Sequence, residues 1–463
     1  MGSITSPDES LPLVDQIASI NHPKSHSKDV HVLSLAFLLV FSAYGAVQNL
    51  ESTVNDEGDL GTISLGILYV SFMIFSFFAS LTVRKLGSKN ALLLGTTGYW
   101  LFTAANLKPN WYTMVPASVY MGFCASIIWV GQGTYLTSTA RSHARDCNLH
   151  EGTVIGNFNG EFWGIYATHQ VIGNLLALFL LKDGNGLSTN GQMLICRHGH
   201  ILQALLLKGD TSGATMLFFV FLCILTFGCI LMCFLHKRDG TLEEQPKESS
   251  ISCSGFVLSV AKSVIKPLFD IRILLIIPLF AYSGLQQAFV WAEFTKKIVK
   301  PALGESGIGG SMAVYGAADA ICSLVAGRFT SSVSSVTWII VGGSSAHAIV
   351  LLWILLKYST TSGVLGMVYP LLMAAALGIG DGVLMTQINA LLGMLFKHDL
   401  EGAFAQLKVW QSLSIAVIFF LTPYISLHMM AAIMLTALCI SLAAFFILTL
   451  KVINGSSSNL SAA

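Results

Sequence analysis

Two short glycine-flanked sites hold the residues of this sequence that are best placed to do chemistry. Gly131-Gln132-Gly133-Thr134-Tyr135-Leu136-Thr137 and Gly380-Asp381-Gly382-Val383-Leu384-Met385-Thr386 share the order glycine, amide or acid, glycine, and a threonine at equal spacing. Glycines loosen a helix, and the polar side chain between them needs a partner or water, because lipid supplies neither. Such sites at corresponding places in two halves of a chain indicate a transporter-like central cavity, which we expect Gln132, Tyr135 and Asp381 to line.

Three carboxylates lie deep inside apolar segments, at Glu161, Asp319 and Asp381. An ionisable group at membrane depth is costly, so each of them is a candidate for a functional site. Lone acids in this position favour the handling of protons or cations. The alternative for Glu161 is a fixed interhelical hydrogen bond, and for the two aspartates it is static pairing with Arg328, Lys408 or a backbone amide.

The apolar segment 154–181 carries two stripes on one helix. Small residues recur at every fourth position and allow another backbone to approach closely; they are Gly152, Gly156, Gly160 and Gly164. With about 100° per residue, Asn157, Glu161 and Thr168 fall within about 40° of one another. His169 lies about 80° from Glu161, so a proton passes between them only through water. We expect Asn157, Glu161 and His169 to line the cavity, and the glycines to serve in helix packing.

A second polar row lies in the segment 307–330. Tyr315, Asp319 and Ser323 stand at i, i+4 and i+8, which places them on one face of a helix. Small residues accompany them at Gly316, Ala320 and Gly327. Gln406 and Gln411, in the segment 401–427, are further candidates for the same seam.

The elements that position these residues are predicted to be transmembrane helices. Of the 463 residues, 54% are hydrophobic and only 11% are charged, whereas soluble domains carry about 25% charged residues. Apolar runs long enough to cross a bilayer, about 20 residues each, recur along the chain. We expect about twelve: 30–50, 60–83, 89–107, 111–140, 154–181, 212–235, 267–295, 307–330, 336–357, 362–395, 401–427 and 429–450.

Basic residues predict which loops face the cytoplasm, because Lys and Arg are enriched on that side. The loops at 84–89, 141–145 and 236–266 are basic, and the loop at 51–59 is acidic. This pattern predicts that both termini are cytoplasmic. The lysines within 296–300 disagree with it, since their loop would face outward.

The domain organisation follows from one polar stretch, 237–266, which we expect to be a cytoplasmic linker. It separates a six-helix bundle at 30–236 from a second one at 267–451, with cytoplasmic tails at 1–29 and 452–463. The predicted fold class is therefore all-α, a polytopic membrane protein of two pseudo-symmetric six-helix bundles like those of the major facilitator superfamily. A stretch at 183–211 holds an apolar patch too short to span a bilayer, and we expect it to be a weakly structured insertion.

Several function classes are excluded by what the sequence lacks. It has no phosphate-binding glycine loop, metal-ligand cluster or nucleophile elbow, so we expect no enzyme activity, no cofactor and no metal site. A net charge of +1 gives no reason to expect nucleic acid as a partner. The nine cysteines show no disulfide framework. The expected partners are the lipid bilayer together with a small solute, an ion or another membrane protein.

Four separate motifs, found in the expected order between about residues 30 and 450, resemble the Unc-93-like family and its plant members most closely. They are Asn49-Leu50-Glu51-Ser52-Thr53-Val54-Asn55, the run Gly131 to Thr137, the run Gly160 to Asn174, and Gln387-Ile388-Asn389-Ala390-Leu391-Leu392-Gly393. The resemblance implies a major-facilitator-type fold and regulation of ion channels, notably potassium channels. For animal relatives it also implies the escort of membrane receptors between compartments. It adds Gln387 and Asn389 to the candidate cavity residues.

The sequence departs from its relatives at three places. Glu51 stands where they often have an amide, and the segment 183–211 lengthens a loop expected to be short. Arg84, in the basic loop at 84–89, occupies the place of an acid that takes part in gating in transporters of the superfamily. Its loss argues against transport.

Three functions therefore compete. The first is regulation of an ion channel, most directly a potassium channel, or of ion homeostasis. The second is proton- or cation-coupled transport of a small solute, and the third is the escort of a membrane protein. The absence of a retrieval signal favours the plasma membrane, whereas the acidic-leucine stretch 8–13 favours an endomembrane or vacuolar location.

Overall fold

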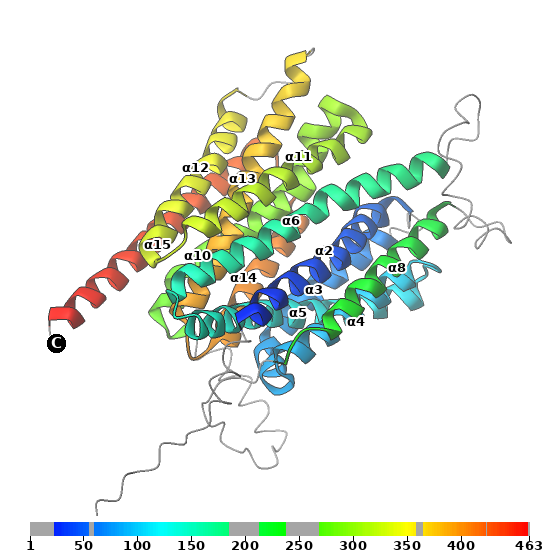
Figure 1. Ribbon diagram of the computed structural model, residues 1–463. Coiled ribbons are helices and arrows are strands. Elements are labelled where there is room, and N and C mark those ends of the chain that lie inside the picture. The colour runs from blue at the N-terminus through cyan, green and yellow to red at the C-terminus, as the bar shows by residue number, and fades with distance from the viewer. Residues whose placement is uncertain are drawn as a thin grey trace, which may run out of the picture.

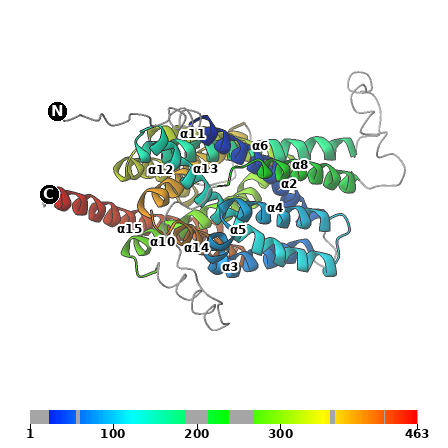
Figure 2. The same cartoon turned by 60° about the horizontal axis from the view of Figure 1, so that its bottom comes forward.

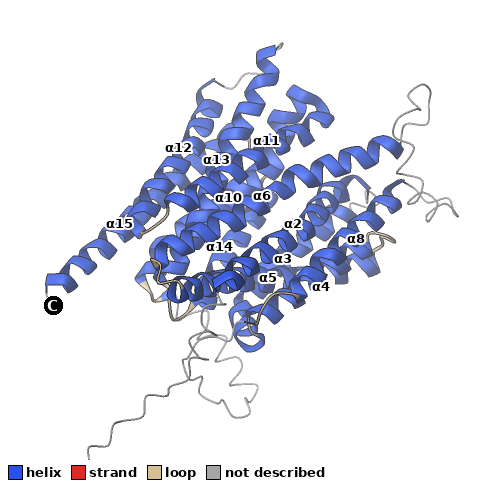
Figure 3. Cartoon of the chain, in the orientation of Figure 1, coloured by secondary structure: helices blue, strands red, loops and turns tan. Residues whose placement is uncertain are grey.

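The computed structural model describes residues 23–54, 60–184, 213–237, 268–357, 364–422 and 424–461. Every regular element in these ranges is a helix (Figure 3). Most of the predicted tail 1–29, of the insertion 183–211 and of the linker 237–266 lies outside the described residues. These three parts of the domain organisation therefore stay predictions.

The helices before residue 237 follow the predicted spans closely. They are α2 (Pro23–Val54), α3 (Leu60–Leu86), α4 (Ser88–Ala105), α5 (Trp111–Asp146), α6 (Glu151–Gly184) and α8 (Gly213–Cys233). Figure 1 shows them in blue to green. The first helix begins at Pro23, within the predicted tail rather than at residue 30.

The helices after residue 268 complete the described fold. They are α10 (Ile271–Ala288), the π-helix η2 (Phe289–Val299), α11 (Lys300–Phe329), α12 (Val333–Lys357), α13 (Val364–Leu395), α14 (Leu400–Leu421) and α15 (Leu427–Ser461). The last helix continues through most of the predicted tail 452–463. Helices α12 and α15 lie at the edge of the molecule opposite to α4 and α8 (Figures 1 and 2).

Length and apolar composition make this a multi-pass membrane protein. Within the described ranges, nine helices are long and apolar enough to cross a membrane. The spans predicted at 89–107, 154–181 and 212–235 fall on α4, α6 and α8, which are not among these nine.

Local sequence explains where two of the helices begin. Asn110 caps α5: its side chain accepts hydrogen bonds from the backbone N–H of Tyr112 at 2.9 Å and of Thr113 at 3.0 Å. Asp399 caps α14 by accepting from the backbone N–H of Gly402 at 3.0 Å. Such caps satisfy amides that the first helical turn leaves without partners.

The lysines within 296–300 do not lie in a loop, which corrects the prediction. They belong to η2 and the start of α11, and the chain turns only at Gly304, whose φ is 74°. The Lys297 ammonium lies 2.7 Å from the Glu293 carboxylate, a side chain with no solvent exposure. Because Glu293 neutralises Lys297, this lysine is a poor indicator of which side of the membrane the segment faces.

Glycines bring α6 and α11 into direct backbone contact near the middle of the molecule. A Cβ added to Gly160 would lie 2.7 Å from the Cα of Gly327, too close for two carbon atoms. Helix α6 accordingly runs between α11 on one side and α2 on the other (Figure 1). Helices α3 and α14 form another contact between the early and the late part of the chain.

Candidate functional site

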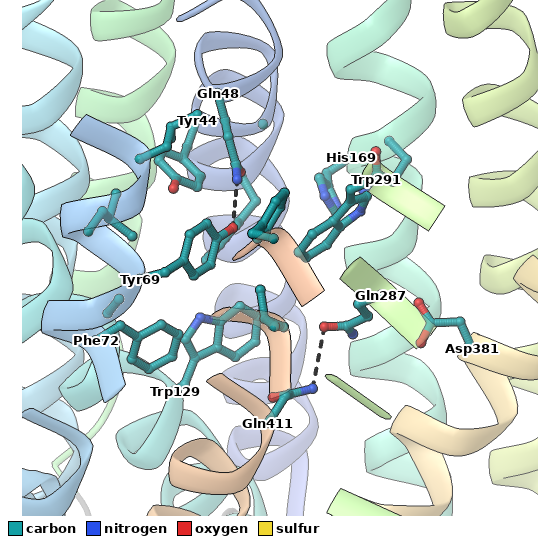
Figure 4. Close-up of a pocket in the computed structure, with 18 of the residues that line it drawn as sticks. Tyr44, Gln48, Tyr69, Phe72, Trp129, His169, Gln287, Trp291, Asp381 and Gln411 are labelled. Atoms are coloured by element: carbon teal, nitrogen blue, oxygen red, sulfur yellow. Dashed lines mark hydrogen bonds between the residues drawn. The ribbon is translucent and has the colours of Figure 1, made fainter. Parts of the chain in front are cut away.

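A cavity of about 720 Å³ lies between the helices before residue 237 and those after residue 268. Its volume falls in the range of about 300–1,000 Å³ that is typical of small-molecule sites. Figure 4 shows Tyr69, Phe72 and Trp129 on one side of it and Gln287 and Asp381 on the other. Aromatic rings are concentrated on the first side, and the acidic side chains lie on the second.

One side, which we call the aromatic wall, is made of rings from α2 to α6. Its members are Phe41, Phe72, Tyr99, Trp129, Trp163 and Tyr166. The rings of Trp129 and Trp163 stack with centroids 5.8 Å apart, and Tyr166 meets Trp129 edge-on at 5.5 Å. Ring pairs in these geometries stabilise each other, so the wall is held in place before any ligand arrives.

The other side, which we call the polar wall, comes from α10, α11, α13 and α14. Its members are Gln287, Tyr315, Asp319, Asp381, Lys408 and Gln411. The Tyr315 hydroxyl donates a hydrogen bond to Asp381 Oδ2. Asp381 Oδ1 has no hydrogen-bond partner in the described part of the chain, although the side chain is only 6% exposed.

Asp319 is positioned by close packing between α11 and α13. The Ser323 hydroxyl lies 3.1 Å from Asp319 Oδ1 and 3.2 Å from the carbonyl oxygen of Gly382, and can donate to either. A Cβ on Gly382 would lie 2.6 Å from Asp319 Oδ1. Glycine at position 382 therefore allows the two helices to approach and brings both aspartates to one wall.

Lys408 does not serve as the static partner of either aspartate. Its ammonium donates to Gln411 Oε1 at 2.8 Å and lies 4.6 Å from the centre of the Trp129 ring. Among the described residues no ion pair joins it to Asp319 or Asp381. A lysine over a ring face is a cation–π contact, and here it spans the cavity from α14 to α5.

Of the other predicted cavity residues, only His169 lies at the cavity with the aspartates. Its Nδ1 is 2.6 Å from the carbonyl oxygen of Tyr166. Gln132 is buried away from the cavity, and its Nε2 has no hydrogen-bond partner within the described residues. The Tyr135 hydroxyl donates to the carbonyl oxygen of His236 at 3.0 Å, which is also outside the cavity lining.

The remaining candidates are likewise placed elsewhere. Glu161 forms an ion pair with His31 of α2, and the half-buried Asn157 is on the same helix, one turn earlier. Gln387 Oε1 accepts from the Thr330 hydroxyl at 2.9 Å, and the Asn389 amide donates to the backbone of its own helix at 2.7 Å. None of these four residues lines the cavity.

The predicted packing glycines of α6 all face α11. A Cβ on Gly156 would lie 2.5 Å from the Cβ of Thr330, and one on Gly164 would lie 2.5 Å from the Cγ of Leu324. Gly160 meets Gly327, as described above. The stripe thus joins two parts of this chain to each other.

A group of charged residues lies where α3 and α5 end and where α14 begins, and we call it the ion-paired end. Arg84 Nη2 lies 2.7 Å from Asp399 Oδ1, and Lys397 Nζ lies 3.0 Å from Glu151 Oε2. Arg141 donates to Glu151 at 3.2 Å and to the Gly393 carbonyl oxygen at 2.7 Å. The unusual basic residue Arg84 therefore has an acidic partner, Asp399, at the N-cap of α14.

Sequence reasoning missed the aromatic wall and one polar-wall residue, Gln287. A signal for part of the wall does exist, because Trp163, Tyr166 and His169 recur every three residues and so share a helix face. Rings at that spacing are also what an ordinary packed core shows. The described residues hold no group of three or more His, Cys, Asp or Glu suited to a metal ion.

Comparison with known proteins identifies the family. Residues 55–448 match the family model described as "Ion channel regulatory protein UNC-93". UNC93-like protein 3 of Arabidopsis thaliana is 61% identical over 431 residues, which cover 92% of this chain and 88% of that protein. The "Putative potassium channel regulatory protein unc-93" of Caenorhabditis elegans is 29% identical over 413 residues, covering 86% of this chain and 57% of that protein.

The fold matches a solved transporter structure. The E. coli fucose:proton symporter FucP superposes with a TM-score of 0.63 at 11% sequence identity, covering 92% of this chain and 99% of that one. A second structure of FucP, described as a Major Facilitator Superfamily transporter in the outward conformation, gives a TM-score of 0.62. The chain belongs to the UNC-93 family and has the fold of a major facilitator transporter, as its motifs predicted.

Proposed function

We propose that this protein regulates ion flux across a membrane, most directly by acting on a potassium channel. The observation that carries the proposal is the match to the ion channel regulatory family over residues 55–448. The name of the C. elegans relative, a putative potassium channel regulatory protein, points to potassium. A partner channel would respond to the conformation of the helices around the central cavity.

We further propose the arrangement in the membrane. Twelve helices form two six-helix bundles, at 30–236 and 267–451, joined by a cytoplasmic linker at 237–266. Both termini are cytoplasmic, and the plasma membrane is the expected location. The basic segments at 84–89 and 141–145, which the structure places at helix ends rather than in open loops, support this orientation, and they contribute Arg84 and Arg141 to the ion-paired end.

The test is electrical recording from cells that express a potassium channel with and without this protein. We expect the potassium current to change several-fold on co-expression, and no current when this protein is expressed alone. The surface amount of the channel is measured in the same cells. An altered current with an unaltered surface amount supports regulation; a change in surface amount alone supports the escort function instead, and no change in either contradicts the proposal.

A second candidate function is proton- or cation-coupled transport of a small solute. It is favoured by one observation: the unpartnered carboxylate oxygen of Asp381 in a cavity between two sets of helices. An ionisable side chain buried at membrane depth is costly, and it is therefore a candidate for a functional site.

Transport is tested with purified protein in liposomes. We expect solute uptake to depend on a proton or cation gradient and to be lost in Asp381→Asn. Glu161→Gln is the matched control, because Glu161 is also an intramembrane acid but pairs with His31 away from the cavity. Equal loss in both variants, or uptake that survives in Asp381→Asn, would count against the cavity as the transport site.

A further inference from the structure

We infer that the central cavity binds an organic cation: an ammonium group, quaternary or protonated, carried on an apolar body. The inference deepens the second candidate function by naming its ligand class. It is tested by binding without any flux, so a failure to bind and a failure to transport are recognised separately. A cationic ligand would equally suit a regulator that senses a solute.

The first support is the free oxygen of Asp381. Tyr315 satisfies Oδ2, whereas Oδ1 has no partner among the described residues. A buried carboxylate oxygen left unpaired costs free energy, which a ligand cation removes by binding to it. Asp319 lies on the same wall and adds a second acidic side chain there.

The second support is the balance of charge in the cavity. Lys408 is the basic residue nearest to these acids in the lining, and its ammonium is already held by Gln411 Oε1 and the Trp129 ring. It leaves the carboxylates unneutralised. Two carboxyl groups against one amine make this wall acidic, which favours a cationic ligand over an anionic one.

The third support is the aromatic wall. Ring faces attract ammonium groups within about 6 Å, and quaternary ammonium ligands are held in this way by clustered aromatic rings. The Lys408–Trp129 contact at 4.6 Å shows that this wall already holds one cation. Further rings at Tyr69, Phe72 and Trp163 line the same space.

The size of the cavity distinguishes an organic from an inorganic cation. Hard metal cations are held by about six or more oxygen atoms arranged around a small centre. Here the acids stand on one wall of a space of about 720 Å³ and face rings on the other. A ligand with an apolar body fills this space and buries its carbon atoms against the rings.

The experiment is isothermal titration of the full-length protein in a maltoside detergent. Choline is compared with its neutral isostere 3,3-dimethyl-1-butanol, and benzyltrimethylammonium tests the benefit of a larger apolar body. We expect choline to bind at least tenfold more tightly than the alcohol, and benzyltrimethylammonium more tightly than choline. In Asp381→Asn, affinity for both cations falls at least tenfold, while the weak binding of the alcohol is unchanged.

The control variant is Asp146→Asn, which removes an acid at the end of α5, outside the cavity lining, and should leave every affinity unchanged. Asp319→Asn serves as the second test variant if Asp381→Asn does not fold, and it should also weaken cation binding. The inference is overturned if the alcohol binds as tightly as choline, or if Asp381→Asn and Asp146→Asn behave alike. It is equally overturned if Na⁺ or K⁺ binds in a way that requires Asp381 while neither organic cation binds.

Discussion

The two glycine-flanked sites share a sequence pattern and have opposite structural roles. At the second site, Asp381 lines the cavity and Gly382 allows α11 to approach. At the first, Gln132 is buried outside the cavity, and Gly133 lies against the ring of Phe404. The same local order of residues thus lines the cavity in one place and makes a helix contact in the other. What each site faces decides its role.

The largest effect is expected from the contact at the first site. Phe404 is almost fully buried, and its ring atoms would lie 2.5 Å from a Cβ on Gly133. We expect Phe404→Ala to lower the free energy of unfolding by about 3–5 kcal/mol. Gly133→Ala should cost less in the Phe404→Ala background than in the native chain, because the ring that it meets is gone. Thermal unfolding followed by size-exclusion chromatography measures both; independent, additive effects would show that the two residues do not share this contact.

A smaller loss of stability is expected at the second site. A Cβ on Gly382 would lie 2.5 Å from the backbone oxygen of Asp319, which cannot rotate away. Overpacking of this kind costs about 1–3 kcal/mol, so Gly382→Ala should lower the melting temperature by several degrees. Gly131→Ala is the matched control: its nearest neighbour would be 3.3 Å away, and the change should stay within about 1 kcal/mol. Similar melting temperatures for the two variants would contradict this account.

The polar residue between the glycines gives the direct functional comparison. If the cavity binds a cation, Asp381→Asn weakens binding at least tenfold, which corresponds to about 1.4 kcal/mol. Gln132→Leu should leave the affinity within about twofold and should not lower stability, because it removes a buried amide that has no partner for its Nε2. A titration of both variants under the same conditions decides the point, and weaker binding in Gln132→Leu would place the first site in the cavity after all.

The smallest effect concerns how α14, the helix of Phe404, is held against the first site. Arg84 pairs with Asp399 at its start, and both side chains are more than a third exposed. Exposed pairs contribute about 0.2–1 kcal/mol. Arg84→Gln should therefore lower stability slightly, and it should cost less in an Asp399→Asn background, where the asparagine still caps α14 but carries no charge. A double-mutant cycle by thermal unfolding gives the coupling energy; a value of zero would leave the pair without a role in holding α14.

The spans and the family could be predicted from the sequence, because apolar length and separate motifs are local signals. The row Tyr315, Asp319 and Ser323 was also predictable, since helical spacing fixes which residues share a face. Helical spacing does not tell which face of one helix packs against which other helix. Glu161 has the same intramembrane setting as Asp381 in the sequence, yet it faces His31 because α6 lies against α2.

Other features left no distinctive trace in the sequence. Nothing in Phe289–Val299 separates a π-helix from an α-helix, so the apolar run was expected to end at residue 295. The aromatic wall resembles ordinary packing until the opposite wall is known. Lys408 could be identified as a buried base, but its position over Trp129 depends on how α14 meets α5.

The meeting of α6 and α11 at Gly160 and Gly327 has a mechanical consequence. At this one point bare backbones touch, while one turn away on either side Thr330 and Leu324 pack on Gly156 and Gly164, so the contact is a close and narrow pivot about which one part of the molecule could tilt against the other. A fulcrum of this kind stays in place while the distance between surfaces far from it changes. The cavity walls, held apart from that line, are the surfaces whose separation would respond most to such tilting.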